Sequence, residues 1–183
     1  SERTVKATDL SDYRVLAFAT HGLVPGDLDG LTQPALAFSE PLLTDDQLND
    51  GFLTMGEVLN LKLNADWVVL SACNTASGEG AGAKAISGLG RAFFFAGTRA
   101  LLVSNWPVES TSTRVLTTNL FQRQVKKPQL SRADALRETM LHLIDGPGYV
   151  DPESGASYFS YAHPIFWAPF TIVGEGGRIT PKS

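Results

Sequence analysis

The sequence predicts an α/β fold with a mostly parallel central sheet. Three largely apolar segments are predicted to be strands: Tyr13–Thr20, Trp67–Leu70 and Thr98–Asn105. Trp67–Leu70 has the length and the β-branched content of a buried strand. Segments with helical periodicity lie between and after them. Strands that alternate with helices favour parallel pairing, with helices covering both faces of the sheet.

The first half of the chain supplies two of these strands and several connections. Residues 1–12 are polar and end in a predicted turn at Ser11-Asp12. After the first strand we expect a Gly- and Pro-punctuated loop (His21–Gly30), a short strand (Ala35–Ser39) and a polar loop (Pro41–Gly51).

A capping pattern marks the first predicted helix. Thr54 precedes an apolar periodic segment, and Glu57 follows three residues later, which completes a capping box. We expect this helix to end near Leu63-Asn64, just before the strand Trp67–Leu70.

The second half is predominantly helical. After a glycine-rich loop, Thr75–Gly82, the sequence predicts a helix over Lys84–Ala96 that Gly97 terminates. Two amphipathic helices, a Gly- and Pro-rich loop, a last strand and a frayed tail are expected in turn: Ser110–Lys126, Ser131–Ile144, Asp145–Ser157, Phe170–Val173 and Gly174–Ser183.

Composition restricts the functional classes. The 183 residues are 43% hydrophobic and 19% charged, and they fit one domain with its own core. A net charge of -4 without a basic cluster argues against nucleic-acid binding. No apolar run reaches the roughly 18 residues of a membrane span. A single cysteine forms no internal disulfide, which suits a reducing compartment, and we expect a cytoplasmic protein.

The single cysteine and a histidine follow two of the predicted strands. Cys73 lies just past Trp67–Leu70, and His21 just past Tyr13–Thr20. Open α/β sheets bind ligands at the carboxyl ends of their strands. If the two strands are parallel neighbours, both side chains emerge at one edge, as a cysteine–histidine nucleophile pair requires. The alternative is a buried, inert thiol, the commoner fate of a lone cysteine.

Two other enzyme classes fit poorly. The glycines of Gly78–Ala83 precede a helix, but a dinucleotide fingerprint needs its first glycine almost directly after the strand. The full P-loop pattern and the Gly-x-Ser-x-Gly elbow of serine hydrolases do not occur in the sequence.

Five segments in order resemble the successive motifs of the CHAT domain, a family of the caspase-like clan of cysteine peptidases related to separase. They are Phe18–Gly22, Leu70–Thr75, Gly88–Gly97, Ser104–Val108 and His163–Phe170. The resemblance covers roughly residues 12–174 and implies a caspase-like α/β/α sandwich with a mostly parallel central sheet. It also implies one domain over residues 1–183 that lacks an N-terminal portion and forms the C-terminal part of a longer protein.

The resemblance implies a catalytic dyad and its oxyanion donors. His21 is expected to act as base and Cys73 as nucleophile, with the backbone N–H groups of Gly22 and Cys73 stabilising the oxyanion. The chemistry agrees, because a thiol with a pKa of about 8.5 needs a neighbouring base at neutral pH. Glycine at position 22 permits close approach of the substrate.

Substrate contacts are expected after the third strand. Ser104 and Asn105 are candidates for hydrogen bonds to substrate, and Trp106 for a pocket wall. Many CHAT domains carry two consecutive acids after Trp-x-Val that favour a basic side chain, whereas here only Glu109 follows Val108. Glu109 alternatively stabilises the amino end of the following helix.

The other two histidines are not expected to be catalytic, and His142 is expected to be a surface or partly buried side chain. His142 falls within a predicted helix, and His163 is expected to form hydrogen bonds before the last strand.

We therefore expect a cysteine endopeptidase that cleaves protein or peptide substrates without cofactor or metal, in a bacterial intracellular protein. Such domains resemble modules that lie beside tetratricopeptide repeats or other sensor domains, which are expected to regulate them. The alternative is a catalytically silent CHAT domain that serves as a regulatory or protein-interaction module.

Overall fold

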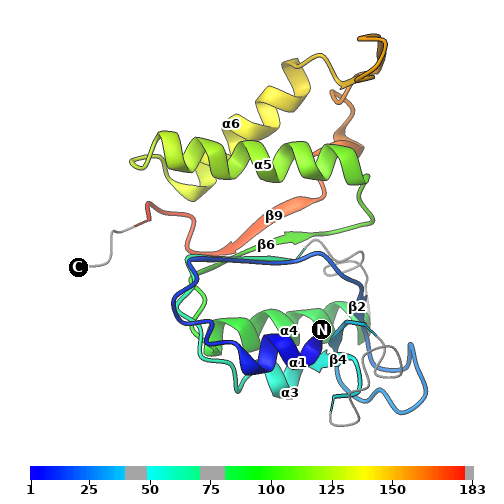
Figure 1. The fold of residues 1–183 in the computed structure, drawn as a ribbon, viewed down its shortest axis with the longest axis vertical. Helices are drawn as coiled ribbons and strands as arrows, with labels where there is room; N and C mark the ends of the chain where they lie inside the picture. Colours follow the sequence, from blue (N-terminus) through cyan, green and yellow to red (C-terminus); the bar gives the residue numbers. More distant parts are fainter. Residues whose placement is uncertain (40–48, 71–80, 180–183) are drawn as a thin grey trace. The chain divides into compact units, whose positions relative to one another are not determined.

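The computed structural model describes residues 1–39, 49–70 and 81–179, except the side chains of residues 81–87. The chain divides into two compact units, Ser1–Trp106 and Pro107–Ser183. Figure 1 shows the fold and labels several of its helices and strands.

The first unit contains a parallel sheet and a small antiparallel one. Its elements in chain order are α1 (Glu2–Ala7), β1 (Val15–Phe18), β2 (Gly22–Leu23), β3 (Ala35–Ala37), β4 (Phe52–Thr54), α3 (Met55–Val58), β5 (Trp67–Leu70), α4 (Ala81–Phe95) and β6 (Ala100–Ser104). β5 pairs in parallel with β1 on one side and with β6 on the other. β3 pairs antiparallel with both β2 and β4. The predicted α/β class and the three predicted strands are confirmed.

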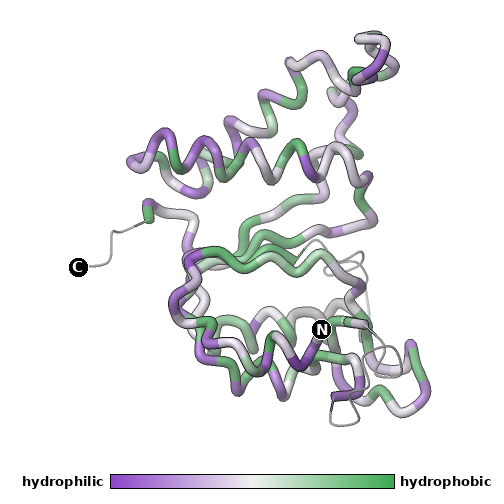
Figure 2. The backbone as a smooth tube through the Cα atoms, in the orientation of Figure 1, coloured by the Kyte–Doolittle hydropathy of each residue, from purple (hydrophilic) through white to green (hydrophobic). Residues whose placement is uncertain are grey.

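One face of the parallel sheet packs against helices of the same unit. Alternate residues of β1 and β5, among them Phe18, Val68 and Leu70, are buried in one cluster with Leu89 and Phe93 of α4. Helices α1, α3 and α4 all lie on this side of the strands (Figure 1). Figure 2 shows these strands as predominantly hydrophobic. The apolar burial that stabilises the unit therefore holds β1 and β5 in fixed register.

The end of α4 agrees with the sequence. Gly97 has φ = +113°, and its N–H donates to the carbonyl of Phe94. An added Cβ would lie 2.1 Å from the carbonyl oxygen of Leu63, so only glycine fits this turn.

The helix that follows Thr54 is shorter than expected. The capping box of Thr54 and Glu57 is present, which confirms the predicted start. α3 ends at Val58, however, and not near Leu63-Asn64. Tight turn bonds take over after Val58: Asn60 N–H donates to the Glu57 carbonyl at 3.0 Å, and the Asn60 side-chain amide to the Gly56 carbonyl at 3.0 Å.

Three elements of the first unit were not predicted. Strand β4 forms directly after the expected loop Pro41–Gly51, where the sequence predicted no strand. Helix α1 forms within the polar residues 1–12, and β2 forms within the expected loop His21–Gly30. Six residues do not sustain a helix in water, so α1 depends on contacts with distant parts of the chain. The predicted turn at Ser11-Asp12 is present, and the predicted loop Pro41–Gly51 lies largely outside the described residues.

The second unit contains a pair of helices and short strands. Its elements are α5 (Ser110–Lys126), α6 (Arg132–Asp145), β7 (Tyr149–Val150), β8 (Ser157–Phe159), η1 (Pro164–Phe166) and β9 (Phe170–Gly174). Glu138 of α6 pairs with Arg123 at 3.2 Å and Lys127 at 3.0 Å. Both predicted helices and the last strand are confirmed. β7 and the first residue of its antiparallel partner β8 fall within the expected loop Asp145–Ser157.

The expectation of a frayed tail is wrong for its described part. The N–H groups of Arg132 and Ala133, which open α6, donate to the carbonyls of Gly177 and Gly176. The first N–H groups of a helix have no partner within it, and here the tail supplies their acceptors.

Candidate functional site

The ends of β1 and β5 define the candidate site. The two strands are parallel neighbours, and their last paired residues are Phe18 and Leu70. His21 lies three residues beyond Phe18, and Cys73 three residues beyond Leu70 in the sequence. Cys73 lies outside the described residues, so its contact with His21 stays a prediction.

His21 has an exposed side chain and a fixed backbone. Its carbonyl accepts a hydrogen bond from the Ala37 N–H at 2.8 Å. The Thr20 hydroxyl donates to the Ala37 carbonyl. Hydrogen bonds to the end of β3 thus fix the backbone of Thr20 and His21, and with it the attachment point of the imidazole. This contact was not predictable from the sequence, because its partners are separated by the loop that contains β2.

Gly22 has a backbone orientation that suits an anion donor. It pairs with Leu36 in the antiparallel ladder of β2 and β3. The hydrogen bond from Ala37 N–H to His21 carbonyl flanks this pair, which makes it a non-hydrogen-bonded pair. In such a pair the N–H points away from the partner strand. The Gly22 N–H is therefore directed away from β3.

A pocket of about 470 Å³ adjoins His21. Its described lining includes residues 16–21 at the end of β1, together with Leu10 and Phe38. Among the described lining residues none carries a formal charge, apart from His21 when protonated. The described lining of this pocket therefore favours apolar groups of a bound molecule over charged ones. The sequence did not predict that Leu10 and Phe38 line this pocket, because they are brought next to residues 16–21 only by the folding of the chain.

The predicted substrate contacts after β6 differ in exposure. Ser104 ends β6 and is fully buried, Asn105 is half-buried, and Trp106 is 37% exposed. Burial of the Ser104 side chain limits what an external molecule can reach there. Asn105 and Trp106 retain accessible surface.

Glu109 caps α5. Its carboxylate accepts the backbone N–H groups of Thr111 at 2.7 Å and Ser112 at 2.6 Å. Partial burial alone raises the pKa of Glu109, but these hydrogen bonds outweigh it, and the net pKa lies below the ordinary value. The structural alternative for Glu109, stabilisation of the helix start, is confirmed.

Replacing Glu109 by alanine should therefore lower the free energy of unfolding by about 1 kcal/mol, the usual value of such a cap. The folded-state pKa is depressed, so the ionised cap stabilises the protein above the unfolded-state pKa. That stabilisation is lost as pH falls through the folded-state pKa. Urea unfolding at pH 7 and at pH 3 tests this, and an equal difference between wild type and Glu109→Ala at both pH values would contradict it.

The two remaining histidines have the structural character expected of them. His142 is exposed on α6. His163 caps η1, with its Nδ1 accepting the N–H of Ile165 at 3.3 Å.

The described ranges lack both a metal-binding cluster and a membrane-spanning helix. There, no group of three or more His, Cys, Asp or Glu side chains is arranged to hold a metal ion. No helix in this described part of the chain has the length and apolarity needed to cross a membrane.

The fold and the candidate site define an α/β protein with a histidine at the end of an edge strand and a cysteine predicted beside it. The sequence profile of the CHAT domain matches residues 1–175, and the chain belongs to the CHAT domain family. It is also similar to tetratricopeptide repeat protein 28 of the mouse, with 26% identity over 138 residues. That match covers 74% of this chain but only 5% of the mouse protein.

Proposed function

We propose that this domain is a cysteine endopeptidase of the caspase/separase type, with Cys73 as nucleophile and His21 as base. The register of β1 and β5 carries the proposal. Phe18 and Leu70 pair, and each candidate residue follows its strand by the same three positions. Adjacent strands lie about 4.8 Å apart, which is the scale of a dyad contact.

In the proposed reaction the imidazole of His21 takes the thiol proton. The thiolate attacks the carbonyl carbon of a peptide bond and forms a tetrahedral oxyanion. The C–N bond then breaks, the amine leaves with the proton held by His21, and an acyl-enzyme remains. Water, deprotonated by the same imidazole, hydrolyses the thioester and regenerates the thiol.

The Gly22 N–H supports the oxyanion part of this proposal. Its direction away from β3 leaves it aimed outside the ladder, next to the proposed base. Together with the N–H of Cys73 it would provide the two donors that the intermediate needs. Loss of one such donor costs about 3 kcal/mol of barrier in other enzymes.

We propose that the substrate is a protein or peptide that contacts Asn105 and Trp106. Ser104 is buried, so its proposed role is to support these two residues. Glu109 already binds the first amides of α5, so it does not favour a basic side chain in the way that a free carboxylate would. The pocket beside His21 has an uncharged described lining, which likewise does not favour a basic substrate side chain.

The domain is proposed to adopt the caspase-like α/β/α arrangement and to work inside a longer protein. The family match extends over both compact units, which supports one domain. The similar mouse protein is named for tetratricopeptide repeats and is far longer than this chain. We propose that a repeat or sensor domain in the same polypeptide regulates cleavage.

The second candidate is a catalytically silent module for regulation or protein interaction. The likeness to a protein named for its repeats favours it, since repeat proteins assemble with partners. The family membership is compatible with both candidates.

Iodoacetamide labelling across pH separates the two candidates, because the chain has a single cysteine. A peptidase site predicts labelling with an apparent pKa below the free value of about 8.5, and a return toward that value in His21→Ala. A thiol that reacts only after unfolding would contradict the peptidase proposal and favour the silent module.

A further inference from the structure

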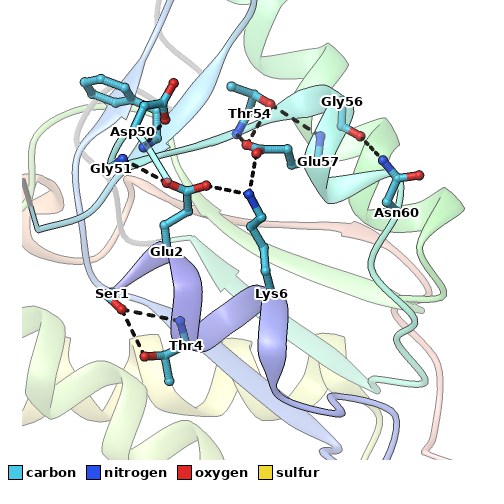
Figure 3. Close-up of polar contacts among 11 residues, drawn as sticks. Ser1, Glu2, Thr4, Lys6, Asp50, Gly51, Thr54, Gly56, Glu57 and Asn60 are labelled. Atoms are coloured by element: carbon cyan, nitrogen blue, oxygen red, sulfur yellow. Dashed lines mark hydrogen bonds and ion pairs between the residues drawn. The ribbon is translucent and has the colours of Figure 1, made fainter. Parts of the chain in front are cut away.

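Glu2 is a buried acid close to the beginning of the described chain. The residue is only 1% exposed, although it lies in the first turn of a six-residue helix. One carboxylate oxygen accepts the N–H of Gly51 at 2.8 Å, and the other accepts from Lys6 Nζ at 2.8 Å (Figure 3). A buried carboxylate without such partners would be strongly destabilising.

Lys6 extends this contact to α3. Its ammonium also donates to Glu57 Oε1 at 2.8 Å, and Glu57 Oε2 accepts the N–H and hydroxyl of Thr54. The hydrogen bonds to Glu2 and Glu57 raise the pKa of Lys6. Helix α1 is thus attached at both its first and its last turn to the segment around β4 and α3 (Figure 3).

A path of backbone hydrogen bonds leads from Glu2 to His21. The carbonyl of Gly51, whose N–H is bound by Glu2, accepts the Phe38 N–H at 2.7 Å. The preceding Ala37 N–H donates to the His21 carbonyl at 2.8 Å. Gly51, which Glu2 binds, therefore holds the end of β3 through Phe38. The end of β3 in turn holds the backbone of His21 through Ala37.

We propose that Glu2 is a positioning residue for His21, acting through Gly51 and the end of β3. The inference rests on the proposed function in that His21 is the base there. A catalytic imidazole must be held within about 0.5 Å of its productive position. Without the buried carboxylate, the Gly51 N–H loses this acceptor, the junction of β3 and β4 loosens, and His21 shifts away from its position.

Apolar residues of α1 and of the segment after it also border the pocket beside His21. Val5 of α1 and Leu10, which follows it, line the pocket that reaches His21. Detachment of the Glu2 contact would therefore move one wall of this pocket together with the backbone of His21.

Amide hydrogen exchange by NMR tests the placement without requiring activity. We expect Glu2→Ala to accelerate exchange at Gly51, Phe38 and Ala37 by at least tenfold, and to leave Val68 and Leu101 in the parallel sheet within twofold. Glu2→Gln keeps an acceptor for the Gly51 N–H and should restore much of the protection. The imidazole resonances of His21 should shift in Glu2→Ala, while those of His142 and His163 stay in place.

Kinetics give the second readout. Glu2→Ala should lower kcat at least tenfold and change KM less, whereas Glu138→Ala, a matched loss of a paired glutamate on α6, should change neither. Unchanged exchange at Phe38 and Ala37, or acceleration spread evenly over all amides, would overturn the inference. An inactive wild type would instead overturn the proposed peptidase and the catalytic part of this inference, while exchange still decides whether Glu2 fixes His21.

Discussion

Replacing Cys73 by alanine should lower kcat/KM for a cleaved peptide by about 10⁴-fold or more. The proposed reaction has no other nucleophile in its first step, and removal of a nucleophile leaves the activity that binding and oxyanion donors alone provide. His21→Ala should cause a loss of similar order. The double variant should be hardly worse than either single one, because residues that act as a unit are not additive.

A peptide-library cleavage profile of wild type and the three variants measures this effect. His142→Ala is the matched control, since that histidine is exposed on α6, and its activity should equal that of the wild type. Thermal unfolding would show that the variants are folded. Cleavage that persists in Cys73→Ala would rule out the cysteine mechanism.

Gly97→Ala should lower the free energy of unfolding by about 3–4 kcal/mol, from backbone strain and overpacking together. The backbone at this position has φ = +113°, and the new Cβ would meet the Leu63 carbonyl oxygen at 2.1 Å. The Leu63 N–H donates to the Ala96 carbonyl at 2.7 Å, so the turn after α4 cannot shift without loss of this bond.

Gly26→Ala provides the control for Gly97→Ala. It also has positive φ, +93°, but no atom lies within 4 Å of the added Cβ. It should therefore show only the backbone cost of about 1–2 kcal/mol. Urea unfolding of both variants separates strain from collision, and equal destabilisation would contradict the close contact at Leu63.

Features with a local cause were predictable from the sequence. The strand Trp67–Leu70 matches β5 residue for residue, because an apolar β-branched run between turns has few alternatives. The start of α3 follows from the Thr54–Glu57 capping box, and the end of α4 from Gly97. These patterns need only neighbouring residues.

Features with a distant cause were not predictable. Helix α1 is too short to form alone, and Glu2 meets Gly51 49 positions away in the sequence. The carboxyl-terminal segment was expected to fray, yet Gly177 supplies an acceptor to the first turn of α6. In both cases the stabilising partner is distant in the sequence, so local residue patterns do not reveal it.

The candidate site shows the same division. His21 could be identified from its place after a strand and from the family resemblance, and parallel pairing of its strand with β5 is confirmed. The two uses of Glu109 could not be separated by sequence, because both place an acid before a helix. The hydrogen bonds to Thr111 and Ser112 identify the cap.

Disulfide trapping tests the central claim most directly, namely that residues 21 and 73 lie side by side. In His21→Cys the native Cys73 is the one other thiol, and a disulfide requires the Cα atoms to lie about 4.4–6.8 Å apart. Under mild oxidation we predict an internal disulfide in the monomer, seen by mass spectrometry after alkylation, and none in the control His142→Cys. Two freely alkylated thiols in His21→Cys, or covalent dimers alone, would contradict the account.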